Sequence, residues 1–132
     1  MEKHEILVRV RYAETDQMGV VYHGNYAQFF EMGRVEWLRN KGISYKELEK
    51  SGVMLPVVSL AMNYKKPAYY DDELTVVTIL KYLGGVKIEF DYDIINQNGE
   101  LLTTANSVLV FVDTKTKRPI SVPQDLEKLL RK

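Results

Sequence analysis

Apolar and polar residues alternate along several parts of this 132-residue chain. In residues 5–12, apolar side chains at every second position predict a first strand with one buried face. The clearest alternation lies in residues 86–94, where every second residue is apolar and each residue between is charged. One face of this segment must therefore meet a core and the other must meet water. The preceding pair Gly84-Gly85 predicts a two-residue hairpin turn.

Further apolar stretches predict additional strands. Residues 53–66 form a long candidate strand, with Pro56 near its start, where a missing N–H donor is least harmful, and Pro67 at its end. Other strands are expected over residues 74–83 and, after a turn at 96–99, over residues 101–112. A polar turn at residues 114–117, a short terminal strand and a helix from about Pro123 complete the chain.

A different period follows the first strand. Large apolar residues and one glycine recur at spacings of three and four, with polar residues among them that include Arg34, which predicts a helix over residues 25–40. The stripe consists of Tyr26, Phe29, Phe30, Gly33 and Trp37. Arg39 and Lys41 suit the negative end of this helix, and Gly42 can supply a left-handed stop. The sequence of residues 44–47 matches a capping box, so a short second helix should continue to Ser51-Gly52.

The predicted order is a strand, a long helix, a short helix and then four or five consecutive antiparallel strands joined by hairpins. One helix lying on a curled antiparallel sheet is an α+β architecture, and 132 residues suit one domain spanning residues 1–132. A single helix covers only part of so large a sheet, and its edge strands would lack partners. Self-association is therefore expected.

Composition excludes several classes of protein. Eighteen basic and eighteen acidic residues balance, which argues against a nucleic-acid binder with a strongly basic face. The absence of cysteine excludes disulfides, thiolate nucleophiles and the usual structural zinc sites. The charged first residues do not resemble a signal peptide, and no apolar run approaches the roughly 20 residues of a membrane span. We therefore expect a cytoplasmic protein without a membrane span.

The segment of residues 16–26 carries the most specific signal. It reads Asp-x-x-Gly-Val-Val-Tyr-His-x-x-Tyr and enters the aromatic-rich helix. This pattern resembles the signature of the 4-hydroxybenzoyl-CoA thioesterase family of hotdog-fold proteins, close to its YbgC-like branch. The resemblance implies a hotdog fold, in which a curled antiparallel sheet of five or six strands wraps a long central helix. It also implies acyl-CoA thioesterase activity with no cofactor, since coenzyme A is part of the substrate, and a homodimer that often pairs into a homotetramer.

Asp16 is the first candidate for catalysis. The residues alone favour a plain helix or turn cap for this aspartate. Its position ahead of a helix N-terminus, with the partial positive charge found there, also favours an ionised carboxylate near free N–H donors. The resemblance makes Asp16 either a nucleophile that forms an acyl intermediate or a general base on water. Glu14 is a weaker candidate and is more simply a solvated partner of Arg9 or Arg11.

The residues at the helix start could bind the thioester. The first four amides of a helix lack intrahelical acceptors, and the resemblance makes the amides of His23 and Gly24 the donors to the carbonyl oxygen. His23 is a candidate acid, base or hydrogen-bond partner, with a capping side chain as the alternative. Tyr22 and Tyr26 could line an acyl pocket. Asn25 is most simply a helix N-cap that also holds the loop in shape.

Cations are needed where coenzyme A phosphates bind. Lys65, Lys66, Lys81, Lys87 and residues 115–118 are available, each of them an exposed solubilising charge by default. We favour Lys117 and Arg118 among them. Only two histidines are present, His4 and His23, so no histidine cluster suits a metal.

The chain lacks the Gly-x-Ser-x-Gly elbow of serine hydrolases and the glycine-rich loops of nucleotide-binding enzymes. Acyl-CoA hydrolysis is therefore the first hypothesis. An acyl carrier protein as the acyl donor is the second, and a non-catalytic module that binds acyl thioesters or a protein is the third. Short aliphatic, longer aliphatic and aromatic acyl groups all suit a pocket lined by Tyr, Phe, Met and Val.

Overall fold

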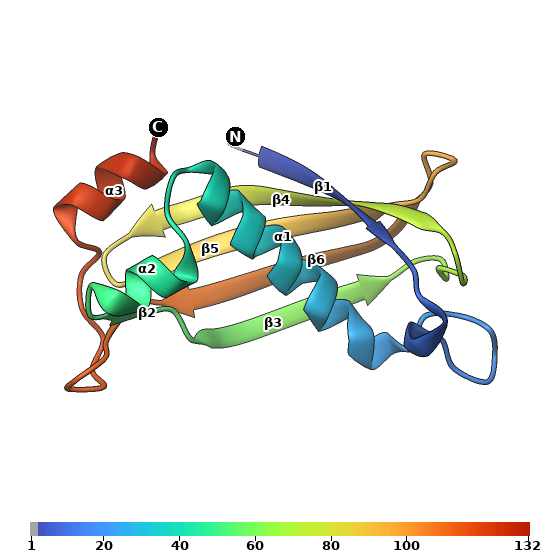
Figure 1. Cartoon of the computed structure of the whole chain (residues 1–132), viewed down its shortest axis with the longest axis horizontal. Helices are drawn as coiled ribbons and strands as arrows, with labels where there is room; N and C mark the ends of the chain where they lie inside the picture. Colours follow the sequence, from blue (N-terminus) through green and yellow to red (C-terminus); the bar gives the residue numbers. More distant parts are fainter. Residues whose placement is uncertain (1–2) are drawn as a thin grey trace.

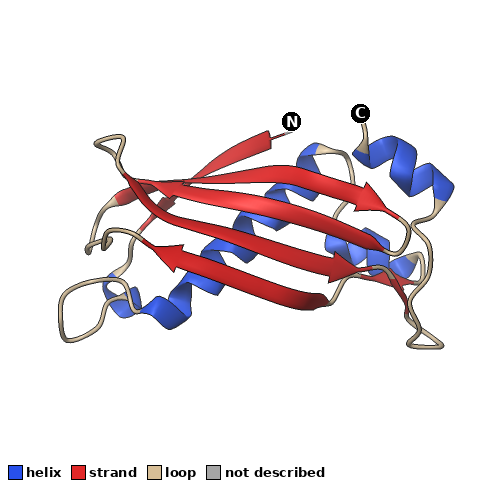
Figure 2. Ribbon diagram, turned by 180° about the vertical axis from the view of Figure 1, so that it is seen from behind, coloured by secondary structure: helices blue, strands red, loops and turns tan. Residues whose placement is uncertain are grey.

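The computed structural model describes residues 3–132 and consists of two layers. Helix α1 (Tyr26–Asn40) lies diagonally across one face of a five-stranded antiparallel sheet (Figure 1). Seen from behind, the opposite face of the sheet is covered by none of the helices that these residues form (Figure 2). The predicted α+β architecture, with a long helix against a curled antiparallel sheet, is confirmed.

The strand order differs from the predicted run of consecutive hairpins. The main sheet has the order β1-β4-β5-β6-β3, so β3 lies at an edge beside β6 and does not pair with β4. Its strands are β1 (Lys3–Arg9), β3 (Val57–Tyr64), β4 (Glu73–Gly84), β5 (Lys87–Ile95) and β6 (Leu101–Val110). Alternation fixes which face of a strand is buried, but it does not select the neighbouring strand, which depends on long-range contacts.

One predicted strand ends earlier than expected, and another is divided into two strands. The strand expected over residues 5–12 ends at Arg9, and a 3-10 turn (Tyr12–Glu14) follows. The strand expected over residues 53–66 divides around Pro56, because β2 (Val53–Met54) pairs with β7 (Val112–Asp113) in a separate two-stranded sheet. The strand predicted after the turn at residues 114–117 is absent among the described residues. Only an isolated bridge between Val112 and Pro119 precedes α3 (Gln124–Leu130).

The central hairpin confirms the pattern analysis closely. Strand β5 buries Ile88, Phe90, Tyr92 and Ile94, the four apolar residues between its charged ones. The turn itself shifts by one residue, because Gly84 pairs with Lys87 and leaves Gly85 and Val86 as the turn.

The capping box is also confirmed, since Ser44 Oγ accepts a hydrogen bond from the Glu47 amide at the start of α2 (Tyr45–Lys50).

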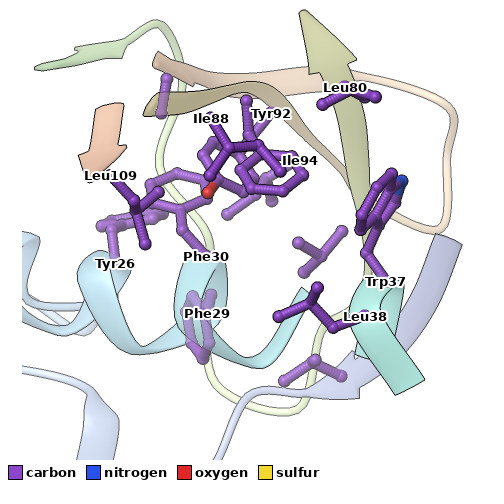
Figure 3. Close-up of a cluster of buried hydrophobic side chains, with 14 of the residues drawn as sticks. Tyr26, Phe29, Phe30, Trp37, Leu38, Leu80, Ile88, Tyr92, Ile94 and Leu109 are labelled. Atoms are coloured by element: carbon purple, nitrogen blue, oxygen red, sulfur yellow. The ribbon is translucent and has the colours of Figure 1, made fainter. Parts of the chain in front are cut away.

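The aromatic stripe of α1 forms the centre of the core. Phe29, Phe30 and Trp37 are almost completely buried, and the rings of Phe30 and Trp37 pack against aromatic side chains of β5 (Figure 3). Gly33 allows the helix to approach the sheet. A Cβ atom at this position would lie 2.5 Å from Thr78 Oγ1 and 3.0 Å from Val76 Cγ1. The core therefore fixes the position of α1 and of the residues that precede it.

Arg34 lies inside the protein, although its polar character suggested the solvent face of α1. Its Nε donates to the Tyr45 hydroxyl at 2.9 Å, and its Nη1 donates to the Tyr92 hydroxyl at 3.2 Å. Burial raises the pKa of the Tyr92 phenol, while the Arg34 guanidinium acts in the opposite direction. These hydroxyls offset part of the cost of burying a cation, so the guanidinium ties α1 to both α2 and β5.

The edge strand β3 exposes an unusual amount of apolar surface. Val57, Val58, Leu60 and Tyr64 are between 39% and 60% exposed. Leu60 and Tyr64 pair with Ser107 and Thr103, whose buried side chains place these two residues on the helix side of the sheet.

None of the helices formed by residues 3–132 is long and apolar enough to cross a bilayer.

Candidate active site

Asp16 lies in a short hairpin loop between β1 and α1. The Asp16 amide donates to the Val20 carbonyl at 2.9 Å, and the Gly19 amide returns a bond to the Asp16 carbonyl at 3.0 Å. Gly19 has a φ of +81°, a left-handed conformation that glycine adopts without strain. A bridge between Thr15 and Val21 closes the base of the loop, so the loop holds Asp16 in a defined position.

The Asp16 carboxylate is half-buried, and one of its two oxygens accepts a hydrogen bond. Its Oδ1 accepts a hydrogen bond from the Met18 amide at 2.9 Å, which caps the turn. No described residue donates a hydrogen bond to the second oxygen, and Asp16 lines a cavity. The capping role and a chemical role are therefore compatible, because they use different oxygens of one carboxylate.

Two acceptor-free amides lie at the start of the helix. A 3-10 turn (His23–Asn25) leads into α1, and the amides of Asn25 and Tyr26 bond to the carbonyls of Tyr22 and His23. Within residues 3–132, the amides of His23 and Gly24 have no backbone or side-chain acceptor. Such amides can stabilise an oxyanion.

A cavity of about 330 Å³ joins the two elements. Three of the predicted site residues line it, namely Asp16, His23 and Tyr26. The other lining residues are Val20, Val21, Tyr64, Lys65, Lys66 and Pro67. Tyr26 is nearly fully buried, and this burial raises the pKa of its phenol. Tyr22, Gly24 and Asn25 do not line the cavity.

The structure gives a packing reason for the glycine at position 24. A Cβ atom on Gly24 would lie 2.6 Å from Cε2 of Tyr22. The missing side chain therefore admits the ring of Tyr22, and it does not leave a space for ligand. The Tyr22 ring in turn packs at 4.4 Å, between centroids, against the imidazole of His23.

His23 is held by aromatic contacts. Its ring lies between Tyr22 and Tyr64, whose centroid is 6.4 Å away, and its carbonyl accepts a long 3.4 Å bond from the Tyr64 hydroxyl. The N-cap of the 3-10 turn is Tyr22 and that of α1 is Asn25, so His23 occupies neither cap position. His23 lines the cavity, and its part as an acid, base or hydrogen-bond partner stays a prediction.

The end of β3 contributes Lys65 and Lys66, two of the cations that the sequence offered but did not favour. The amides of Lys65 and Lys66 both donate to the Leu102 carbonyl, at 2.8 and 3.0 Å. These two residues thus oppose the single residue Leu102 on β6, as in a β-bulge. Both lysines line the cavity. Lys66 Nζ is 2.9 Å from a carboxylate oxygen of Glu100. Pro67 was the sequence signal for this end of the strand, but its proximity to Asp16 was not predictable.

Lys117 and Arg118, the favoured cations, do not lie near this cavity within one chain. They follow β7 in a turn where the Thr114 amide bonds to the Gly52 carbonyl, beside α2 and β2. Figure 1 shows this turn and the loop of residues 16–20 at opposite ends of the molecule. Strand β6 accounts for this separation. It begins near the cavity, at Leu102, and runs away from it for about 25 Å before the turn begins. Lys117 and Arg118 therefore do not border the cavity of the same chain, and their part in binding the coenzyme A phosphates stays a prediction.

Glu14 also differs from the expected solvated residue. It is only 6% exposed. Its carboxylate oxygen Oε2 lies 3.2 Å from Nη2 of Arg11, which is one of the two predicted partners. Oε1 accepts a further bond from the Arg11 amide at 2.7 Å. Both carboxylate oxygens are thus occupied, and Glu14 does not line the cavity.

Comparison with known proteins agrees with the fold and with the sequence segment around Asp16. Residues 10–130 match the thioesterase-like superfamily. YneP of Bacillus subtilis is 42% identical over 113 residues, which cover 86% of this chain and 82% of YneP. The acyl-CoA thioester hydrolase YbgC of Escherichia coli is 34% identical over 119 residues, covering 90% of this chain and 89% of YbgC.

A solved structure extends this similarity to three dimensions. The DHNA-CoA thioesterase from Staphylococcus aureus superposes with a TM-score of 0.94 and 36% identity, covering 99% of this chain and 90% of that one. The fold is therefore the hotdog fold, and its class is that of the thioester hydrolases. The chain belongs to the thioesterase-like superfamily.

Proposed function

We propose that this protein hydrolyses acyl-CoA thioesters, with Asp16 as the nucleophile or the general base. One observation carries the proposal: Asp16, whose second carboxylate oxygen accepts no hydrogen bond from a described residue, lines the same cavity as His23, and the acceptor-free amides of His23 and Gly24 lead into the helix. Water adds to the thioester carbonyl, the C–S bond breaks, and a carboxylic acid and free coenzyme A leave. The relatives named as acyl-CoA thioester hydrolases support this choice of substrate class.

The residues divide this work. The His23 and Gly24 amides stabilise the charge that develops on the carbonyl oxygen. Asp16 attacks the carbonyl carbon directly, or it accepts a proton from the attacking water. The His23 imidazole is placed to donate a hydrogen bond or a proton to the thioester. Tyr26 forms a wall of the acyl pocket, whereas Tyr22 holds the His23 ring in place.

The test is a panel of acyl-CoA thioesters with short aliphatic, long aliphatic and aromatic acyl groups, in which release of free thiol is followed. We expect turnover of at least one member, and the panel also reveals the acyl preference. Matched acyl groups on an acyl carrier protein serve as the comparison. Faster turnover on that carrier would show that the substrate is an acyl carrier protein thioester and not an acyl-CoA thioester. Tight thioester binding without thiol release would contradict catalysis.

We further propose that two chains pair through β3. This edge strand bonds to β6 on one side only, and its exposed apolar residues would be covered by a second copy. Light scattering should give twice the chain mass of 15.3 kDa, or four times that mass if dimers pair. Leu60→Lys should shift the protein toward single chains at low concentration. Leu7→Lys on the other edge strand is the control, and a single-chain mass for the unmodified protein would contradict the proposal.

A further inference from the structure

The side chain of Asn25 makes a contact that neither capping nor substrate binding requires. Its Nδ2 donates to the backbone carbonyl of Glu14 at 2.9 Å, across eleven residues of sequence. Asn25 occupies the N-cap position of α1, but its side chain forms no cap hydrogen bond. It does not line the cavity either. The side chain therefore links the start of the helix to the segment that precedes Asp16.

Glu14 is a firm anchor for this link. Its carbonyl accepts a second hydrogen bond from the Tyr22 amide at 2.9 Å, so both lone pairs of the oxygen are used. Its buried carboxylate holds the amide and the guanidinium of Arg11. The anchor is thus fixed from the side of β1 through Arg11 and from the side of the helix through Tyr22 and Asn25.

The two halves of the site meet at this point. Asp16 follows Glu14 by two residues, and the bridge between Thr15 and Val21 leaves little freedom between them. The His23 and Gly24 amides lie immediately before Asn25. The hydrogen bond from Asn25 to Glu14 therefore connects the segment that carries the carboxylate to the segment that carries the amides, although it touches neither group.

We propose that Asn25 is a positioning residue for thioester hydrolysis, acting through Glu14 on the placement of Asp16 relative to the His23 and Gly24 amides. The inference rests on the proposed function. A misplacement of about 1 Å at a reacting group costs on the order of 10²-fold in rate, so the loss of this bond should lower kcat. Since no contact with substrate is lost, KM should change little.

The experiment measures kcat and KM for Asn25→Ala and Asn25→Asp, each in the native chain and in an Asp16→Asn background. In the native chain both variants should lower kcat by about 10–100-fold, with KM within about twofold. Asn25→Asp has the size of the native residue, so it removes the donor without leaving a cavity and serves if the alanine variant fails to fold. In the Asp16→Asn background, either change should cost less than about twofold, because the group being positioned is no longer there.

Matched controls are Asn98→Ala and Asn98→Asp in the exposed turn after β5, which should match the native rate. An equal loss from Asn25→Ala in both backgrounds would indicate general structural damage and would overturn the inference. A raised KM with unchanged kcat would make Asn25 a substrate contact and would also overturn it. A native protein that releases no thiol from any acyl-CoA would instead remove the proposed function, so the two failures are distinct.

Discussion

Replacement of Asp16 by asparagine should lower kcat for acyl-CoA hydrolysis by a factor of about 10²–10⁴, the usual contribution of a positioned base. Asparagine keeps the shape of the side chain, and its Oδ1 can still accept the Met18 amide that caps the loop. The second carboxylate oxygen, which faces no donor in the native protein, becomes an amide group that neither attacks nor accepts a proton. The loss should therefore fall on catalysis and leave the fold intact.

The measurement is thiol release under single-turnover conditions, accompanied by a thermal unfolding curve. Asp125→Asn, on an exposed position of α3, provides the matched control and should retain the native rate. Undiminished hydrolysis by Asp16→Asn would refute the assignment of Asp16. Label found in the Asp16 carboxylate after a single turnover in ¹⁸O-labelled water would establish nucleophilic attack, because general-base catalysis forms no anhydride with Asp16.

Phe30→Ala should lower the free energy of unfolding by about 3–5 kcal/mol, the range for truncating a buried aromatic residue. Phe30 is fully buried on α1, and its ring lies 4.9 Å, between centroids, from Tyr92 on β5 (Figure 3). Loss of this ring removes apolar contacts and leaves a cavity between the helix and the sheet. Such a change is a large part of the roughly 5–15 kcal/mol that holds a domain folded.

Urea unfolding followed by circular dichroism measures this loss. Phe30→Leu keeps much of the volume and should cost clearly less than the alanine variant. Equal losses for the two variants would show that the ring contact with Tyr92 dominates over volume. A loss below about 1 kcal/mol for Phe30→Ala would contradict the placement of this side chain in the core.

Local features of the sequence determined much of the fold. The strict alternation of charged and apolar residues placed β5 within one residue, and the Ser44–Glu47 capping box located α2. The aromatic stripe placed α1 within one residue at its start, and the Asp16 segment indicated the family that the comparisons support. Each of these signals lies within a few neighbouring residues, where backbone geometry alone sets the period.

Only the tertiary structure decided which distant segments meet. It paired β3 with β6, buried Arg34 against Tyr45 and Tyr92, and placed Lys65 and Lys66 beside Asp16. It also directed the Asn25 side chain to Glu14 instead of to its own helix. These outcomes depend on contacts between residues eleven or more positions apart, which a local pattern does not encode. The sequence by itself determined the helix and strand segments and the class of chemistry that the Asp16 loop indicates, whereas the three-dimensional packing decided which cations and amides lie near that carboxylate.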